Sequence, residues 1–206
     1  MNLKRWILDR RPKRIVECGA GSGELTRQIS SLFEIYNFEF HVISDAIVDS
    51  LHKNILWHRG LSYEVLQSFD DASIDMCIID TDHNYWTLMK EFACLFNRMN
   101  ERGLIALHDV DTFYHDTGMA LSYSTGDVYP KDTIESFASN GSLGDAMIEF
   151  LHLKRLNYRL LAYTHESQGA ALLEKKTQRE YAIVVPGERP VYAQNKEVKD
   201  AMLQVS

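Results

Sequence analysis

The chain lacks long hydrophobic runs. Its apolar runs, such as MCII from Met76 and LIAL from Leu104, fall far short of the roughly 18 residues that a membrane-spanning helix needs. The apolar stretch within the basic residues 1–14 is too short for a signal peptide, and no small-residue cleavage site follows it. These absences predict a cytoplasmic protein with no membrane partner.

The chain also lacks an excess of positive charge. It contains 22 Lys and Arg against 29 Asp and Glu, for a net charge of -7. Because proteins that bind phosphate backbones carry a positive excess, we expect no nucleic-acid partner. Cysteine is scarce and odd in number, and Cys18, Cys77 and Cys94 lie within apolar patterns. This usage predicts buried reduced thiols rather than a disulfide framework.

The composition that remains is that of a folded domain, with 45% hydrophobic and 25% charged residues. At about 150 residues per domain, the length allows one domain with an insertion. The region 111–141 is rich in Tyr, Asp, Thr, Ser and Gly and has little periodicity, as expected of a functional loop. We therefore expect a single domain over 1–206, with a substrate-side loop or insertion at about 111–141.

Strand and helix patterns alternate along the first half of the chain. Strands are predicted over 14–20, 39–45, 55–60, 74–82 and 103–110, and helices over 23–36 and 84–99. A third helix is predicted after Ser142, late strands over 158–164, 170–176 and 181–186, and a tail helix from Lys196. Repeated βα units predict an α/β fold with a doubly wound, mostly parallel sheet and an antiparallel C-terminal edge.

A glycine-rich segment, ECGAGSG over 17–23, lies between the first strand and the first helix. Its glycines let the backbone approach a ligand closely, which is typical of a nucleotide cradle. A dinucleotide fingerprint would need a glycine at position 24, where this chain has Glu24. The Glu17 carboxylate would repel a pyrophosphate but suits a cationic amino group. The segment therefore favours a zwitterionic ligand over NAD.

The sequence VECGAGSG resembles the first motif of class I S-adenosylmethionine-dependent methyltransferases, in which the acid and the glycines hold the amino acid part of the cofactor. Asp45 closes the second strand, where the family places an acid on the ribose hydroxyls. Leu61 and Ser62 resemble the stretch that contacts the adenine, although packing and turn capping are equal alternatives for them. The resemblance implies these cofactor contacts: Glu17, Gly19, Ala20, Gly21, Gly23, Asp45, Leu61, Ser62 and Asp80.

Acidic and histidine side chains follow the fourth and fifth expected strands, in IDTDHNYW and ALHDVD. They emerge side by side at the carboxyl edge of a doubly wound sheet, where ligands bind. The two motifs resemble those of the macrocin and aminocoumarin sugar O-methyltransferases and of cephalosporin hydroxylase-like proteins. The resemblance implies a magnesium site at Asp80, His108 and Asp109, with Asp82 as the catalytic base.

His108 departs from this pattern, because magnesium-dependent relatives have a carboxylate there and an imidazole favours Mn, Fe or Zn. The need for a divalent cation, Mg or Mn, is therefore open. With a cation, the substrate hydroxyl is acidified and Asp82 accepts its proton. Without one, His83 or His108 serves as the base. Helix capping by the aspartates is the structural alternative.

These features predict a methyltransferase that acts on a hydroxyl of a small molecule, sugar or glycan. The loop supplies aromatic faces suited to a polyhydroxylated ring, or aromatics that pack back on the domain: Phe113, Tyr114, His115, Tyr123 and Tyr129. The alternatives are a cofactor-binding domain without turnover and an NAD-type oxidoreductase. Relatives of this group often pair, which leaves a homodimer open.

Overall fold

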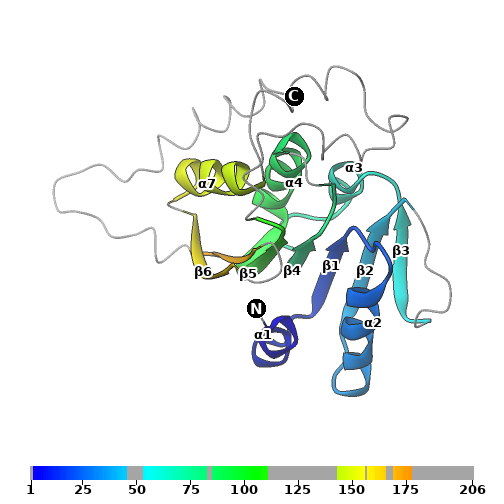
Figure 1. The fold of residues 1–206 in the computed structure, drawn as a ribbon. Helices are drawn as coiled ribbons and strands as arrows, with labels where there is room; N and C mark the ends of the chain where they lie inside the picture. Colours follow the sequence, from blue (N-terminus) through cyan, green and yellow to red (C-terminus); the bar gives the residue numbers. More distant parts are fainter. Residues whose placement is uncertain are drawn as a thin grey trace.

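The computed structural model describes residues 2–45, 53–82, 85–110, 143–155, 157–165 and 169–177. Seven strands form one sheet in the order β3-β2-β1-β4-β5-β7-β6 (Figure 1). The strands are β1 Arg14–Cys18, β2 Glu39–Ser44, β3 Ile55–Arg59, β4 Ile74–Ile79, β5 Met99–His108, β6 Tyr158–Thr164 and β7 Ala170–Lys175.

The first five strands are parallel, and β7 joins β5 and β6 in antiparallel pairs. The predicted fold class is therefore confirmed, including the antiparallel C-terminal edge. The direction of the strand order reverses between β1 and β4. Strands β2 and β3 follow on one side of β1, and β4 and β5 follow on the other side. Ligands of doubly wound sheets bind at the carboxyl ends of the strands beside such a reversal.

Helices cover both faces of the sheet (Figure 1). They are α1 Leu3–Arg10, α2 Glu24–Ser30, the 3-10 helix η1 Ser31–Glu34, α3 Ser62–Leu66, α4 Tyr85–Arg98 and α7 Leu143–Leu153. On one face α4 packs against α7, with the rings of Phe92 and Phe150 stacked at 4.0 Å between centroids. On the other face α1 and α2 bury Ile7 and Ile29 against the sheet. In the described part of the chain, no helix has the length and apolarity to cross a bilayer.

Four elements differ from the sequence-based expectation: α1, α2, α3 and β5, of which α3 was not predicted as a helix. Helix α1 was not predicted, yet Asn2 caps it by accepting a hydrogen bond from the Arg5 backbone at 3.1 Å, and Ile7 is fully buried. Helix α2 ends at Ser30 and continues as η1, and β5 begins at Met99, four residues before the expected start. The expected loop 111–141, strand 181–186 and tail helix from Lys196 lie outside the described residues.

Gly19 sits where three strands meet. Its N–H donates to the Ile43 carbonyl of β2, and the Asp80 N–H donates to the Cys18 carbonyl, both at 2.9 Å. Gly19 has a φ of +87°, and a Cβ there would lie 2.1 Å from the Asp80 carbonyl oxygen. An L side chain at this position would therefore collide with backbone.

Gly19→Ala is expected to lower the free energy of unfolding by several kcal/mol, because the collision adds to a left-handed backbone cost of about 1–2 kcal/mol. Urea denaturation measures the loss. Gly21→Ala is the matched control, because Gly21 also has a positive φ but its Cβ would meet nothing within 4 Å. Equal losses in the two variants would contradict the collision.

Candidate active site

The glycine loop joins β1 to α2 in a tight turn. Gly19, Gly21 and Gly23 have φ values of +87°, +48° and +75°, which L side chains rarely adopt. The Gly23 N–H donates to the Ala20 carbonyl at 2.7 Å, and the Gly23 carbonyl accepts from the Arg27 N–H at 2.9 Å. Because a Cβ on Gly21 would meet open space, a ligand can approach the backbone at this point.

Glu17 lies on β1, next to the loop, and is fully buried. Burial raises the pKa of its carboxyl to about 8, while the nearby Thr26 hydroxyl opposes this shift and the negative charge of Asp80 adds to it. Among the described residues, no donor makes a well-formed hydrogen bond to either carboxylate oxygen. A buried acid without such a partner is uncommon in folded proteins. It fits a cationic amino group as its missing partner.

The residues expected beside the ribose and the adenine lie on neighbouring elements. Asp45 is exposed and directly follows β2. Strand β2 also holds the glycine loop, because its Ile43 carbonyl accepts a hydrogen bond from the Gly19 N–H. Leu61 directly precedes α3, and Ser62 begins it. Ser62 is buried, and its hydroxyl donates to Glu91. The contacts of Asp45, Leu61 and Ser62 with a cofactor stay predictions, and the Ser62 hydroxyl already has a protein partner.

Glu91, an acid at the centre of this region, was not among the predicted site residues. It is fully buried on α4 and accepts hydrogen bonds from Ser62 and, at 3.5 Å, from Thr81. It thereby links α3, the segment after β4 and α4. Its helical neighbours Leu88 and Phe92 are buried as well. An acid on the apolar stripe of a helix was the signal that could have revealed it.

Glu91→Gln is expected to change how stability depends on pH. Burial raises the pKa of Glu91 from 4.5 to about 8. The contribution of Glu91 to the free energy of unfolding is therefore fully present below pH 4.5 and is lost as the pH rises through about 8. Replacing Glu91 should remove up to about 1.4 kcal/mol per pH unit of that decline. Urea unfolding between the two pKa values measures the slope.

Glu64→Gln is the matched control for this experiment, because Glu64 is an exposed acid on α3. The amide that Glu91→Gln introduces would still accept from Ser62, so the hydrogen bond is preserved while the ionisable group is lost. A slope that is the same in the wild type and in Glu91→Gln would show that Glu91 does not titrate in this range.

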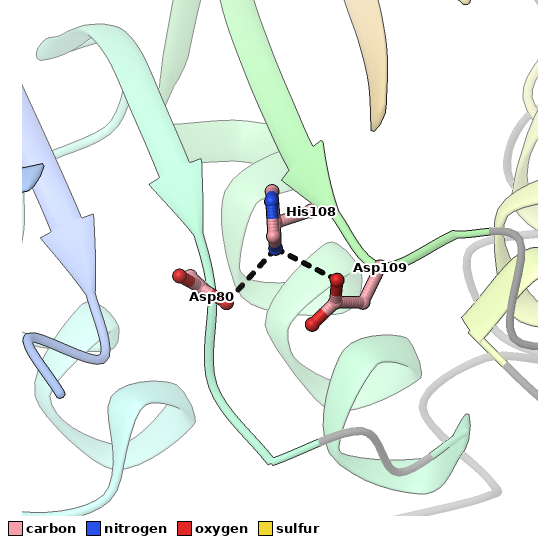
Figure 2. A group of neighbouring side chains, drawn as sticks. All are labelled: Asp80, His108 and Asp109. Carbon is pink, nitrogen blue, oxygen red and sulfur yellow. Dashed lines mark ion pairs between the residues drawn. The ribbon is translucent and has the colours of Figure 1, made fainter. Parts of the chain in front are cut away.

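Asp80, His108 and Asp109 come together at the carboxyl ends of β4 and β5 (Figure 2). The His108 Nδ1 lies 2.9 Å from Asp109 Oδ1 and 3.6 Å from Asp80 Oδ1. One ligand atom from each residue falls within 4.8 Å of the other two. Asp109 and then Asp80 raise the pKa of His108 to about 10. Without a cation, the ring therefore stays protonated between the two carboxylates at neutral pH.

Asp82 follows this group on the chain, and its Oδ2 accepts a hydrogen bond from the Thr87 hydroxyl at 3.1 Å. Thr87 lies in the first turn of α4, so this side-chain bond holds the Asp82 carboxylate beside the start of the helix, where either a capping acid or a base could lie. His83 lies outside the described residues. The roles of Asp82 and His83 in proton transfer stay predictions.

Comparisons with known proteins bear on the family and the fold. Residues 16–110, from β1 to the residue after Asp109, match the model of a family described as methyltransferase domain. A search of curated proteins finds no match. Among solved structures, the fold is similar to that of MycE, a methyltransferase of the mycinamycin pathway in complex with Mg, S-adenosylhomocysteine and mycinamycin VI. The TM-score is 0.59 at 20% sequence identity, and the match covers 90% of this chain and 51% of the MycE chain.

Two further structures are smaller than MycE. A methyltransferase of Podospora anserina, PaMTH1, bound to S-adenosylhomocysteine, has a TM-score of 0.58 at 14% identity over 84% of this chain and 76% of its own. An O-methyltransferase of Bacillus cereus, also with S-adenosylhomocysteine, has a TM-score of 0.56 at 13% identity over 84% of this chain and 79% of its own.

Residues 16–110, just under half of the chain, match a methyltransferase family, and the fold is that of the class I S-adenosylmethionine-dependent methyltransferases. The resemblance seen in the sequence is thus confirmed at the level of this class, whose cofactor is S-adenosylmethionine. The chain spans about half the length of MycE, at 51%.

Proposed function

We propose that the protein transfers the methyl group of S-adenosylmethionine to a hydroxyl oxygen of a small molecule or glycan. The grouping of Asp80, His108 and Asp109 beside the glycine cradle carries the proposal (Figure 2). Asp80 joins the two parts, because its carbonyl oxygen would lie 2.1 Å from a Cβ on Gly19. The O-methyltransferases among the structural neighbours support oxygen as the acceptor atom.

The cofactor fits the cradle. The buried Glu17 carboxylate would meet its amino group, and the open space at Gly21 would admit its amino acid part. Asp45, at the end of the neighbouring strand, would accept hydrogen bonds from the ribose hydroxyls. Once bound, the cofactor supplies an electrophilic methyl on a sulfonium. The protein's contribution is then largely to hold the acceptor oxygen in line with that methyl.

The donor set at the edge of the sheet fits a divalent cation. Asp80, His108 and Asp109 would hold it, and the imidazole favours Mn, Fe or Zn over Mg. A bound cation lowers the pKa of a hydroxyl that it contacts. Binding would also require His108 to lose its proton, so affinity should fall as the pH is lowered.

Asp82 is the base that we propose for the acceptor proton. His108 is a poor acceptor without a cation, because its pKa of about 10 keeps it protonated at neutral pH. With a cation, its Nδ1 would be a ligand. Asp82 lies two residues beyond Asp80 and is oriented by Thr87. His83 remains the second candidate for this role.

Methyl transfer from isotope-labelled S-adenosylmethionine to a panel of phenols, sugars and hydroxy acids tests the proposal directly. The panel is run after chelation and again with added Mn²⁺ or Mg²⁺. We expect label to enter an ether linkage and the rate to rise with the cation. A chain that binds the cofactor but methylates nothing in the panel under any condition would favour a cofactor-binding role without turnover.

A further inference from the structure

A cavity of about 660 Å³ lies between α1, α2 and the sheet, and it reaches Asp80 and His108. Its volume falls within the roughly 300–1,000 Å³ of small-molecule pockets. None of the glycines of the loop is among its lining residues. The cavity therefore approaches the metal-ligand cluster from the side of α1, while the cofactor cradle approaches it from the end of β1.

The walls of this cavity are mixed, with Asn2 and Gln28 as polar side chains among a larger number of apolar ones. Helix α1 contributes Leu3 and Ile7, and α2 contributes Leu25 and Ile29. The sheet closes it with side chains near the carboxyl ends of β4 and β5. A ring or short carbon skeleton would bury its faces here, with one end at Asp80 and His108.

Lys4 brings a positive charge to the same cavity, from the exposed side of α1. Within the described residues, no carboxylate oxygen lies within 4 Å of its ammonium group. The nearby Glu24 carboxylate accepts hydrogen bonds from Gln28 and Arg27. These bonds lower the pKa of Glu24 more than the charge of Lys4 does. Lys4 is therefore available to an acidic group of a ligand.

We propose that this cavity is the acceptor site and that the acceptor is a small hydroxylated organic acid. Its hydroxyl lies at Asp80 and His108, its apolar body lies between α1 and α2, and its carboxylate meets Lys4. The proposal rests on the methyltransferase function and adds a substrate class to it. It also gives α1, which precedes the segment matched by the family model, a role in acceptor selection.

Ligand-observed NMR on the full chain, saturated with S-adenosylhomocysteine, tests this site with two matched probes. The probes are 4-hydroxyphenylacetate and its neutral amide, 4-hydroxyphenylacetamide. We expect the acid to bind the wild type more tightly by roughly two- to fivefold, the range for a solvent-exposed ion pair. Lys4→Gln should abolish the preference, and Lys4→Glu should reverse it.

Arg5→Gln is the matched control, because Arg5 is the adjacent exposed cation on α1 and is absent from the cavity lining. It should retain the preference for the acid, and none of the three variants should change the affinity for S-adenosylhomocysteine. Equal binding of the two probes, binding of neither, or a preference that survives Lys4→Gln would overturn the acceptor site. Failure of the wild type to bind S-adenosylhomocysteine would instead remove the proposed function itself.

Discussion

Gly21→Val is expected to weaken S-adenosylhomocysteine binding by on the order of 100-fold or more, which corresponds to about 2.7 kcal/mol. The position has no protein atom within 4 Å of an added Cβ, so a valine side chain would occupy the space left for the ligand. Isothermal titration of the wild type and the variant measures the change.

The folding of this variant is checked separately. Gly21 has a φ of +48°, so valine also adds backbone strain, and circular dichroism with urea denaturation must show that the variant is folded. Gly21→Ala is the intermediate, with a smaller side chain and less backbone strain, because alanine is not β-branched. If Gly21→Val is folded and binds with unchanged affinity, the glycine loop does not contact the cofactor.

Asp82→Asn is expected to lower turnover by on the order of 100-fold while the affinity for S-adenosylhomocysteine stays nearly constant, because a proton acceptor contributes to the chemical step alone. The amide keeps the shape of the side chain and can still accept from Thr87. The measurement is kcat for an acceptor from the labelled panel, together with the pH profile of the rate.

Thr87→Val separates catalysis from helix capping at this position. It removes the donor to Asp82 and keeps the volume of the side chain. If Asp82 only holds the first turn of α4, Asp82→Asn should keep the wild-type stability because its amide still accepts, Thr87→Val should lose some stability, and the folded fraction of each should turn over at the wild-type rate. A base role predicts a large loss of kcat in Asp82→Asn and a smaller one in Thr87→Val, where the base is less well oriented.

The sequence was informative where local pattern and chain connectivity decide the structure. Strands β1 and β4 are short apolar runs, the glycines after β1 require a turn, and βα alternation implies a parallel sheet. Parallel strands end at one edge, so the meeting of Asp80 with His108 and Asp109 followed from their places on the chain. No ligand chemistry was needed to foresee that proximity.

The sequence was less informative where long-range packing decides. Helix α1 has a largely charged surface, and its burial of Ile7 depends on a sheet formed by later residues. The burial of Glu91 depends on Ser62 and Thr81, which lie 29 and 10 residues away along the chain. The cavity beside Lys4 exists because α1 and α2 lie over the same strands, and no motif encodes it.

Calorimetric titration of the purified chain with S-adenosylhomocysteine tests the central claim most directly, because it requires no knowledge of the acceptor. The titration is run after chelation and again with added Mn²⁺. The account predicts saturable binding at micromolar concentrations that is lost in Gly21→Val. Absence of binding by the folded wild type under both conditions, or tighter binding of NAD than of S-adenosylhomocysteine, would contradict it.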